Sequence, residues 1–155
     1  MTGNSGRQGG RIVVGVDGSP SSKAALAWAV RQAALTGAKV DAVHAWHNPV
    51  SYSYGYGYAM VLPVPDLEKF ARQALDEAIA AVADLAPGVE IRPVVVEDNP
   101  AQALLDAAKG ADLLVVGSRG HGGFTEALLG SVGQHCVHHA DCPVVVIRGT
   151  GHEGA

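Results

Sequence analysis

The chain has 155 residues, 48% of them hydrophobic, which is enough for one domain with a buried core. Its formal net charge is -4 and its basic residues form no cluster, which argues against a dedicated nucleic-acid surface. Two cysteines are too few for a disulfide-stapled secreted domain, and no apolar run is long enough to cross a membrane. We therefore expect a cytoplasmic protein without nucleic-acid or membrane partners.

The first predicted elements are a strand, a helix and a second strand. Residues 11–16 form a short β-branched run that is typical of a strand buried on both faces. Ser19 and Pro20 predict a helix start, because serine is a good N-cap and a proline at the first helical position loses no hydrogen bond. We expect this helix to end near Gly37, and residues 40–46 to form the second strand.

An irregular stretch over residues 47–65 follows, in which four tyrosines alternate with serines and glycines. It is too long for an ordinary connection, which favours a lid-like functional loop or a mobile segment. We expect Asp66 to cap the next helix and Pro87 and Gly88 to end it. Its apolar residues recur at helical spacing and predict one buried stripe, made of Leu67, Phe70, Ala71, Ala74, Leu75, Ala78, Ile79, Val82 and Leu85.

The alternation of strand and helix continues after this helix. We expect a strand over residues 89–96, in which Pro93 indicates an edge or bulged position. Asn99 and Pro100 begin a third helix, and residues 112–116 form a fourth strand that is buried on both faces. A glycine-rich turn and a further helix come next.

The last helix is expected to end near Ala140, and residues 143–148 form the fifth strand. The glycine-rich tails, residues 1–10 and 149–155, are expected to be disordered. Strands that alternate with helices must be parallel, joined by right-handed crossovers, with helices on both faces. We therefore predict one doubly wound, Rossmann-like α/β domain over residues 11–148, with a five-stranded parallel sheet. The order that we expect for its strands is 3-2-1-4-5.

A glycine-rich motif follows the fourth strand, with the spacing Gly117-x2-Gly120-x9-Gly130-Ser131. Glycines let backbone N–H groups approach a ligand closely, and consecutive N–H groups in such a turn bind anions. Gly130 and Ser131 can begin a helix whose N-terminus favours a phosphate. The alternative is a connection that needs glycines only for tight packing. The P-loop motif and the G-x-G-x-x-G of dinucleotide-binding folds are both absent.

Over about residues 10–148 the chain resembles the universal stress protein family. The similarity lies in residues 11–19, 117–123, 130–132 and 142–148. The family's ATP-binding branch is marked by Gly-x2-Gly-x9-Gly-(Ser/Thr), which this sequence matches at every position. Asp98 departs from the family, which often has glycine before Asn-Pro. The resemblance implies a regulatory module of the stress response that binds ATP and Mg²⁺ and dimerises through the strand over residues 143–148.

The resemblance also implies a role for each matching position. Asp17 would lie near the ribose and the metal-linked phosphates, so it would meet Mg²⁺ only through the nucleotide, and Gly15 would lie beside the nucleotide. Ala45 would meet the adenine through its backbone, and Val116 and Gly117 would line the base and ribose. The positions expected to hold phosphates are Gly120, His121, Gly122, Gly123, Gly130, Ser131 and Val132.

Several of these side chains have simpler interpretations. Asp17 can be an ordinary turn or cap residue. Arg119 and His121 lie inside the glycine-rich loop, where each either contacts phosphate or is solvated. His135 and His139 are four residues apart on a predicted helix, a spacing that can serve one metal, with His138 and Cys142 nearby. Histidine near a helix C-terminus is also favourable without a metal. Cys136 and Cys142 read as small buried fillers rather than a redox pair.

The alternative function is a slow ATP hydrolase or nucleotidyl transferase on the same scaffold. Hydrolysis needs a residue that positions water and groups that stabilise developing charge. Asp17, Arg119 and His121 are candidates near the phosphates, but no acid–base pair can be placed and the signatures of related adenylating enzymes are absent. The sequence therefore favours a binding module with no catalytic residue assigned.

Overall fold

Five parallel strands lie side by side in the order β3-β2-β1-β4-β5, which confirms the predicted order. The computed structural model describes residues 10–46, 64–118 and 130–148, so the predictions for both tails and for most of residues 47–65 fall outside the described residues. The strands are β1 (Arg11–Gly15), β2 (Lys39–Trp46), β3 (Ile91–Glu97), β4 (Leu113–Gly117) and β5 (Val144–Ile147). The helices are α2 (Pro20–Thr36), α3 (Val64–Val82), the short 3-10 helix η3 (Ala83–Leu85), α4 (Pro100–Ala107) and α5 (Ser131–His139).

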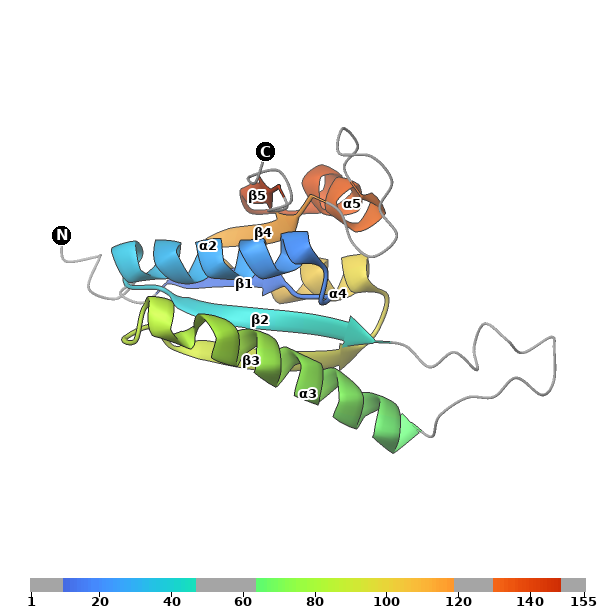
Figure 1. Cartoon of the computed structure of the whole chain (residues 1–155). Coiled ribbons are helices and arrows are strands. Elements are labelled where there is room, and N and C mark those ends of the chain that lie inside the picture. The colour runs from blue at the N-terminus through green and yellow to red at the C-terminus, as the bar shows by residue number, and fades with distance from the viewer. Residues whose placement is uncertain (1–9, 47–63, 119–129, 149–155) are drawn as a thin grey trace, which may run out of the picture.

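Helices cover both faces of the sheet (Figure 1), as predicted. Successive side chains of a strand point to opposite faces. Ile12 and Val14 therefore join a buried cluster beneath α2 and α3, whereas Val13 joins a second cluster beneath α4 and α5. The three middle residues of β1 and of β4 are all buried, which confirms that these two strands are covered on both sides.

The bounds of α2 follow from local capping signals. The hydroxyl oxygen of Ser19 accepts a hydrogen bond from the N–H of Ser22 at 3.2 Å, and Pro20 is the first helical residue. The helix ends at Gly37, whose φ of 80° lies in the left-handed region that glycine adopts readily. Both ends of this helix are confirmed as predicted.

Two predictions about α3 are wrong. The helix begins at Val64, so Asp66 is not its cap but lies in the first turn, where a carboxylate favours the helix dipole. The buried stripe is narrower than predicted, because Phe70 is 53% exposed, Leu85 is 47% exposed and Ala74 is exposed. The helix packs on β2 and on the edge strand β3.

Edge positions are occupied by β3 and β5. Pro93 lies in β3 opposite Ala42 of β2, which confirms the predicted edge strand. This strand begins at Ile91, later than predicted, because the N–H of Val89 bonds to the carbonyl of Ala86 in a turn. A proline is tolerated here because an edge strand does not use every N–H in the ladder.

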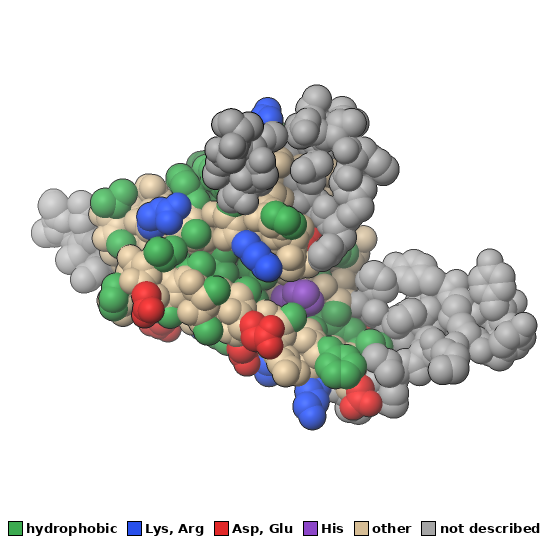
Figure 2. Space-filling model, in the orientation of Figure 1, with side chains coloured by type: hydrophobic (Ala, Val, Ile, Leu, Met, Phe, Trp, Pro, Cys, Tyr) green, Lys and Arg blue, Asp and Glu red, His purple; other side chains and the backbone are tan. Residues whose placement is uncertain are grey.

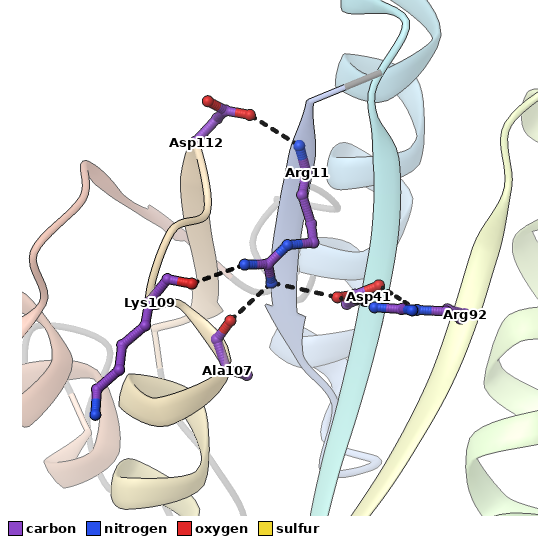
Figure 3. A network of polar contacts seen from close by, with 6 residues as sticks. All are labelled: Arg11, Asp41, Arg92, Ala107, Lys109 and Asp112. Atoms are coloured by element: carbon purple, nitrogen blue, oxygen red, sulfur yellow. Dashed lines mark hydrogen bonds and ion pairs between the residues drawn. The ribbon is translucent and has the colours of Figure 1, made fainter. Parts of the chain in front are cut away.

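At the N-terminal ends of the strands, here called the amino edge of the sheet, polar side chains join neighbouring elements (Figure 3). The buried carboxylate of Asp41 accepts hydrogen bonds from Arg11 at 3.3 Å and, through both oxygens, from Arg92 at 2.9 Å. Arg11 also donates to the carbonyls of Ala107 and Lys109, both at 2.8 Å, where α4 ends. One arginine therefore ties β1 to β2 and satisfies the C-terminal carbonyls of a helix.

The outer face formed by α2 and α3 carries side chains of both charges among hydrophobic ones (Figure 2). Across residues 10–46, 64–118 and 130–148, none of the helices has both the length and the apolar character that a membrane crossing requires. A cytoplasmic location stays a prediction.

Candidate functional site

Strands β1 and β4 are neighbours at the point where the strand order reverses, and both end in glycine. The register pairs Gly15 with Val43 of β2 and Val14 with Val115 of β4. The predicted positions Gly15, Ala45, Val116 and Gly117 therefore lie together at the carboxyl edge of three adjacent strands. Open α/β sheets bind ligands at this kind of switch point.

Both strand-end glycines allow helices to approach closely. A Cβ at Gly15 would lie 2.8 Å from a methyl group of Leu104 in α4. A Cβ at Gly117 would lie 2.5 Å from the hydroxyl of Ser21 and 2.9 Å from the backbone nitrogen of Ser22, in the first turn of α2. Packing therefore requires glycine at Gly117, where backbone atoms are in the way, whereas at Gly15 the end of the Leu104 side chain would have to move.

Asp17 orders the turn between β1 and α2. Its carboxylate accepts a hydrogen bond from the N–H of Ser19 at 2.9 Å, and its own N–H donates to the hydroxyl of Ser22 at 3.2 Å. Gly18 in the same turn has a φ of 85°. Asp17 thus makes the hydrogen bonds that its simpler interpretation, as a turn residue, requires. Its side chain is also exposed at the carboxyl edge, so a nucleotide contact stays a prediction.

Sequence reasoning assigned no role to His44, which joins β2 to this turn. Its Nδ1 lies 2.9 Å from the carbonyl oxygen of Val16, so this nitrogen carries the proton and donates. The N–H of Val16 donates in turn to the carbonyl of Val43 at 2.8 Å. The residue before Asp17 is therefore held on both sides by β2. The available signal was a polar side chain near the end of an apolar strand.

The helices that start at the carboxyl edge are capped differently. Ser19 caps α2, and the side-chain oxygen of Asn99 caps α4 by accepting from two backbone N–H groups at 2.9 and 3.1 Å. The N-cap of α5 is Gly130, which has no side chain and makes no side-chain capping bond. The first-turn N–H groups of α5 therefore face the edge without a carboxylate, amide or hydroxyl from their own cap residue.

The two described ends of the glycine motif meet in space. The N–H of Gly130 donates to the carbonyl of Ser118 at 2.7 Å, and the N–H of Ser118 donates to the carbonyl of Ile147 at 2.7 Å. Gly117, Ser131 and Val132 are therefore brought close to one another at the start of α5. The predicted positions between them, Arg119, Gly120, His121, Gly122 and Gly123, lie outside the described residues.

A family model described as the universal stress protein family matches residues 10–148. The chain belongs to the universal stress protein family. A universal stress protein of Mycolicibacterium smegmatis is 38% identical over 141 residues, which cover 89% of this chain and 48% of that one. The chain thus spans about half the length of the curated relatives it matches.

Solved universal stress proteins share the whole fold. The structure of universal stress protein UspA from Lactobacillus plantarum superposes with a TM-score of 0.70 at 26% identity, covering 90% of this chain and 97% of that chain. Another universal stress protein, solved in complex with cAMP, has a TM-score of 0.69 at 28% identity, covering 90% of this chain and 97% of that one. The five-stranded order and the helices on both faces are therefore those of universal stress proteins.

In the second half of α5 and just beyond it, this universal stress protein carries both of its cysteines and three of its seven histidines. Cys136 of α5 is fully buried in the cluster that α5 shares with α4 and the sheet, as predicted for a filler. Burial, with a smaller effect of Cys142, raises the pKa of Cys136 to about 11. Cys142 is only half-buried, and burial raises its pKa as well. Both side chains are thus kept as thiols. Within the described ranges, no group of three or more His, Cys, Asp or Glu side chains is arranged to hold a metal ion.

Proposed function

We propose that this universal stress protein binds ATP with Mg²⁺ at the carboxyl edge of its sheet, and that the bound nucleotide alters the surface or the dimer that other proteins recognise. The observation that carries the proposal is the start of α5. There a glycine-capped helix N-terminus is joined by a 2.7 Å hydrogen bond to the end of β4. The intact spacing from Gly117 to Ser131 supports ATP as the nucleotide.

Phosphate is the group that fits the start of α5. The capping side chains Ser19 and Asn99 already accept hydrogen bonds from the first turns of α2 and α4. At α5 the corresponding N–H groups, together with the positive end of the helix dipole, are suited to an anion. The hydroxyl of Ser131 would add one donor, and the loop residues 119–123 would complete the phosphate contacts.

The neighbouring strand ends would hold the rest of the nucleotide. Gly15 and Val116 flank the switch point, and Ala45 lies next to the last residue of β2 at the same edge. We assign the base to the backbone near Ala45 and Val116, and the ribose to Gly117 and Asp17. Mg²⁺ bound to the phosphates would neutralise their charge, and Asp17 would reach it through the nucleotide.

The choice of an adenine nucleotide is supported by the cAMP complex of a relative that is 28% identical. Competition decides between ATP, AMP and cAMP. If the phosphates bind at α5, ATP should displace bound AMP or cAMP at a lower concentration than either of them needs to displace ATP. The reason is that ATP brings more phosphate oxygens to those N–H groups.

We also propose a homodimer through residues 143–148. β5 is an edge strand, and all four of its residues are only partly buried within the single chain. Exposed edge strands pair readily with another strand. Light scattering of the purified protein with and without ATP measures the mass in solution, and a monomer under every condition would contradict this part of the proposal.

A Gly130→Asp substitution tests the phosphate site. The backbone there, φ −65° and ψ 163°, accepts any residue, so aspartate would cap α5 as Asn99 caps α4. Its carboxylate would occupy the N–H groups and repel phosphate. Because two like charges about 4 Å apart repel by about 4 kcal/mol at an effective dielectric constant of 20, we expect ATP affinity to fall at least roughly 100-fold. The free energy of unfolding should change by only about 0.5 kcal/mol.

Isothermal titration with ATP and Mg²⁺ provides the measurement, on protein shown by mass spectrometry to be free of nucleotide. Wild type should bind about one ATP per chain. The control Gly88→Asp introduces the same charge at a position with open space around it, so it should bind ATP as well as wild type does. If Gly130→Asp bound ATP with wild-type affinity, phosphate would not bind at the start of α5. No binding by wild type at millimolar ATP would overturn the function, and steady ADP release would establish the hydrolase instead.

A further inference from the structure

We propose that His135 and His139, on the exposed face of α5, form a binding site for a borderline divalent transition-metal cation such as Ni²⁺, Zn²⁺ or Cu²⁺. The two histidines supply the protein ligands, and water completes the coordination. This site lies toward the opposite end of α5 from the proposed phosphate contacts and does not depend on them.

The spacing of the two rings is close to what a shared metal requires. Residues four apart on a helix lie on the same face, one above the other. The ring centres of His135 and His139 are 4.4 Å apart, with their planes tilted by 39°. Two imidazoles bound side by side to one metal at about 2.1 Å have ring centres about 4.5 to 5 Å apart. The pair therefore already has nearly the spacing that a bound cation imposes.

Both histidines have their ring nitrogens available for coordination. Their side chains are exposed, and within the described part of the chain their ring nitrogens make no hydrogen bond or ion pair that a metal would have to displace. His138 is exposed on the same helix, but its ring centre lies 6.4 Å from that of His139, at an edge-on angle of 64°. It is therefore the matched control for the pair.

The ligand type selects the class of cation. Imidazole suits Zn²⁺, Ni²⁺ and Cu²⁺, whereas Mg²⁺ requires oxygen ligands, so this site would not compete for the Mg²⁺ that accompanies a nucleotide. The described residues provide no third protein ligand, which leaves the remaining positions to water. The order of affinity should be Cu²⁺, then Ni²⁺, then Zn²⁺. A bound cation would also link two successive turns of a helix that has only nine residues.

Titration of the full chain with NiCl2 in the absence of nucleotide tests the site. We expect His135→Ala and His139→Gln each to lower Ni²⁺ affinity at least roughly tenfold, while His138→Ala changes it by less than about twofold. Saturating Ni²⁺ should raise the Tm of wild type by about 2–4 °C and leave the Tm of His135→Ala unchanged. Circular dichroism checks that these exposed substitutions leave the fold intact.

Three results would overturn the proposal. The first is that wild type binds no Ni²⁺. The second is that His135→Ala and His139→Gln both keep wild-type affinity, which places the binding on other histidines. The third is that His138→Ala weakens binding as much as the other two variants, which makes the interaction a general property of a histidine-rich surface.

Discussion

At the amino edge of the sheet, Asp41 and two arginines tie three strands to the end of α4 (Figure 3), whereas at the carboxyl edge β1 and β4 end in glycines. The amino edge is held by side chains that satisfy one another. At the carboxyl edge Ser19 and Asn99 cap α2 and α4, but the cap residue of α5 is Gly130, which offers the first turn no side chain. A ligand site is proposed at the one of these three helix starts that lacks a capping side chain.

This contrast predicts two kinds of mutant. Changes at the amino edge should lower stability and leave nucleotide affinity alone, because Arg11 and Asp41 lie at the opposite ends of their strands from Gly15 and Ala45. Changes at the carboxyl edge should act on binding first. The three substitutions below challenge that division or make it sharper.

Gly117→Ala should have the largest effect on stability of the three. It is an exception to the division above, because it lies at the carboxyl edge but should destabilise the fold. Its Cβ would lie 2.7 Å from the carbonyl carbon of Ser21 and 2.9 Å from the nitrogen of Ser22, which are backbone atoms that cannot rotate away. We expect a loss of about 3 kcal/mol in the free energy of unfolding, measured by urea denaturation. Gly88→Ala, in open space, serves as the control. A variant as stable as wild type would show that α2 shifts at no cost.

Asp41→Ala should cost about 2 kcal/mol of the free energy of unfolding. Breaking a fully buried ion pair costs about 3–5 kcal/mol, but here water can reach the partners, whose side chains are 30% and 59% exposed. ATP affinity should stay within about twofold of wild type, since the change is at the far edge. Arg92→Ala should destabilise less, because Arg11 still pairs with the carboxylate. A large loss of ATP affinity in Asp41→Ala would show that the two edges are coupled.

Gly37→Ala should have the smallest effect of the three, a loss of about 1 kcal/mol measured by thermal unfolding. A Cβ there has free space, so the cost comes only from the φ of 80° at the end of α2. Gly37→Asn should lose less, because asparagine tolerates this conformation better than alanine. Equal stability of wild type and Gly37→Ala would mean that the helix end rearranges.

Sequence alone predicted the features that depend on neighbouring residues. Ser19, Pro20 and Gly37 gave both ends of α2, since capping acts over a few residues. The strand order followed from alternation and from the family resemblance. The start of α3 was missed because Asp66 satisfies the pattern of a cap and of a first-turn acid equally well.

Contacts between distant residues could not be predicted. The close approach of Leu104 to Gly15 and the ion pair of Arg92 with Asp41 join residues far apart in the chain. A charged residue inside an apolar strand was the only signal for Asp41, and it does not name a partner. For the candidate site, the described ends of the motif, Gly117 and Gly130, do lie together, but the contacts of His44 and the lack of a capping side chain at α5 could be seen only in the structure.

The hydrogen bond from the N–H of Gly130 to the carbonyl of Ser118 holds the end of β4 against the start of α5. Insertions or deletions between these two positions should therefore have little effect on β4 and α5, because closure entropy changes by only about 0.6 kcal/mol for each doubling of length. The scaffold therefore does not dictate how many residues separate the glycines. In a set of related sequences, a constant number of residues between Gly120 and Gly130 would therefore indicate selection for nucleotide binding. A variable number would indicate members that no longer bind the nucleotide.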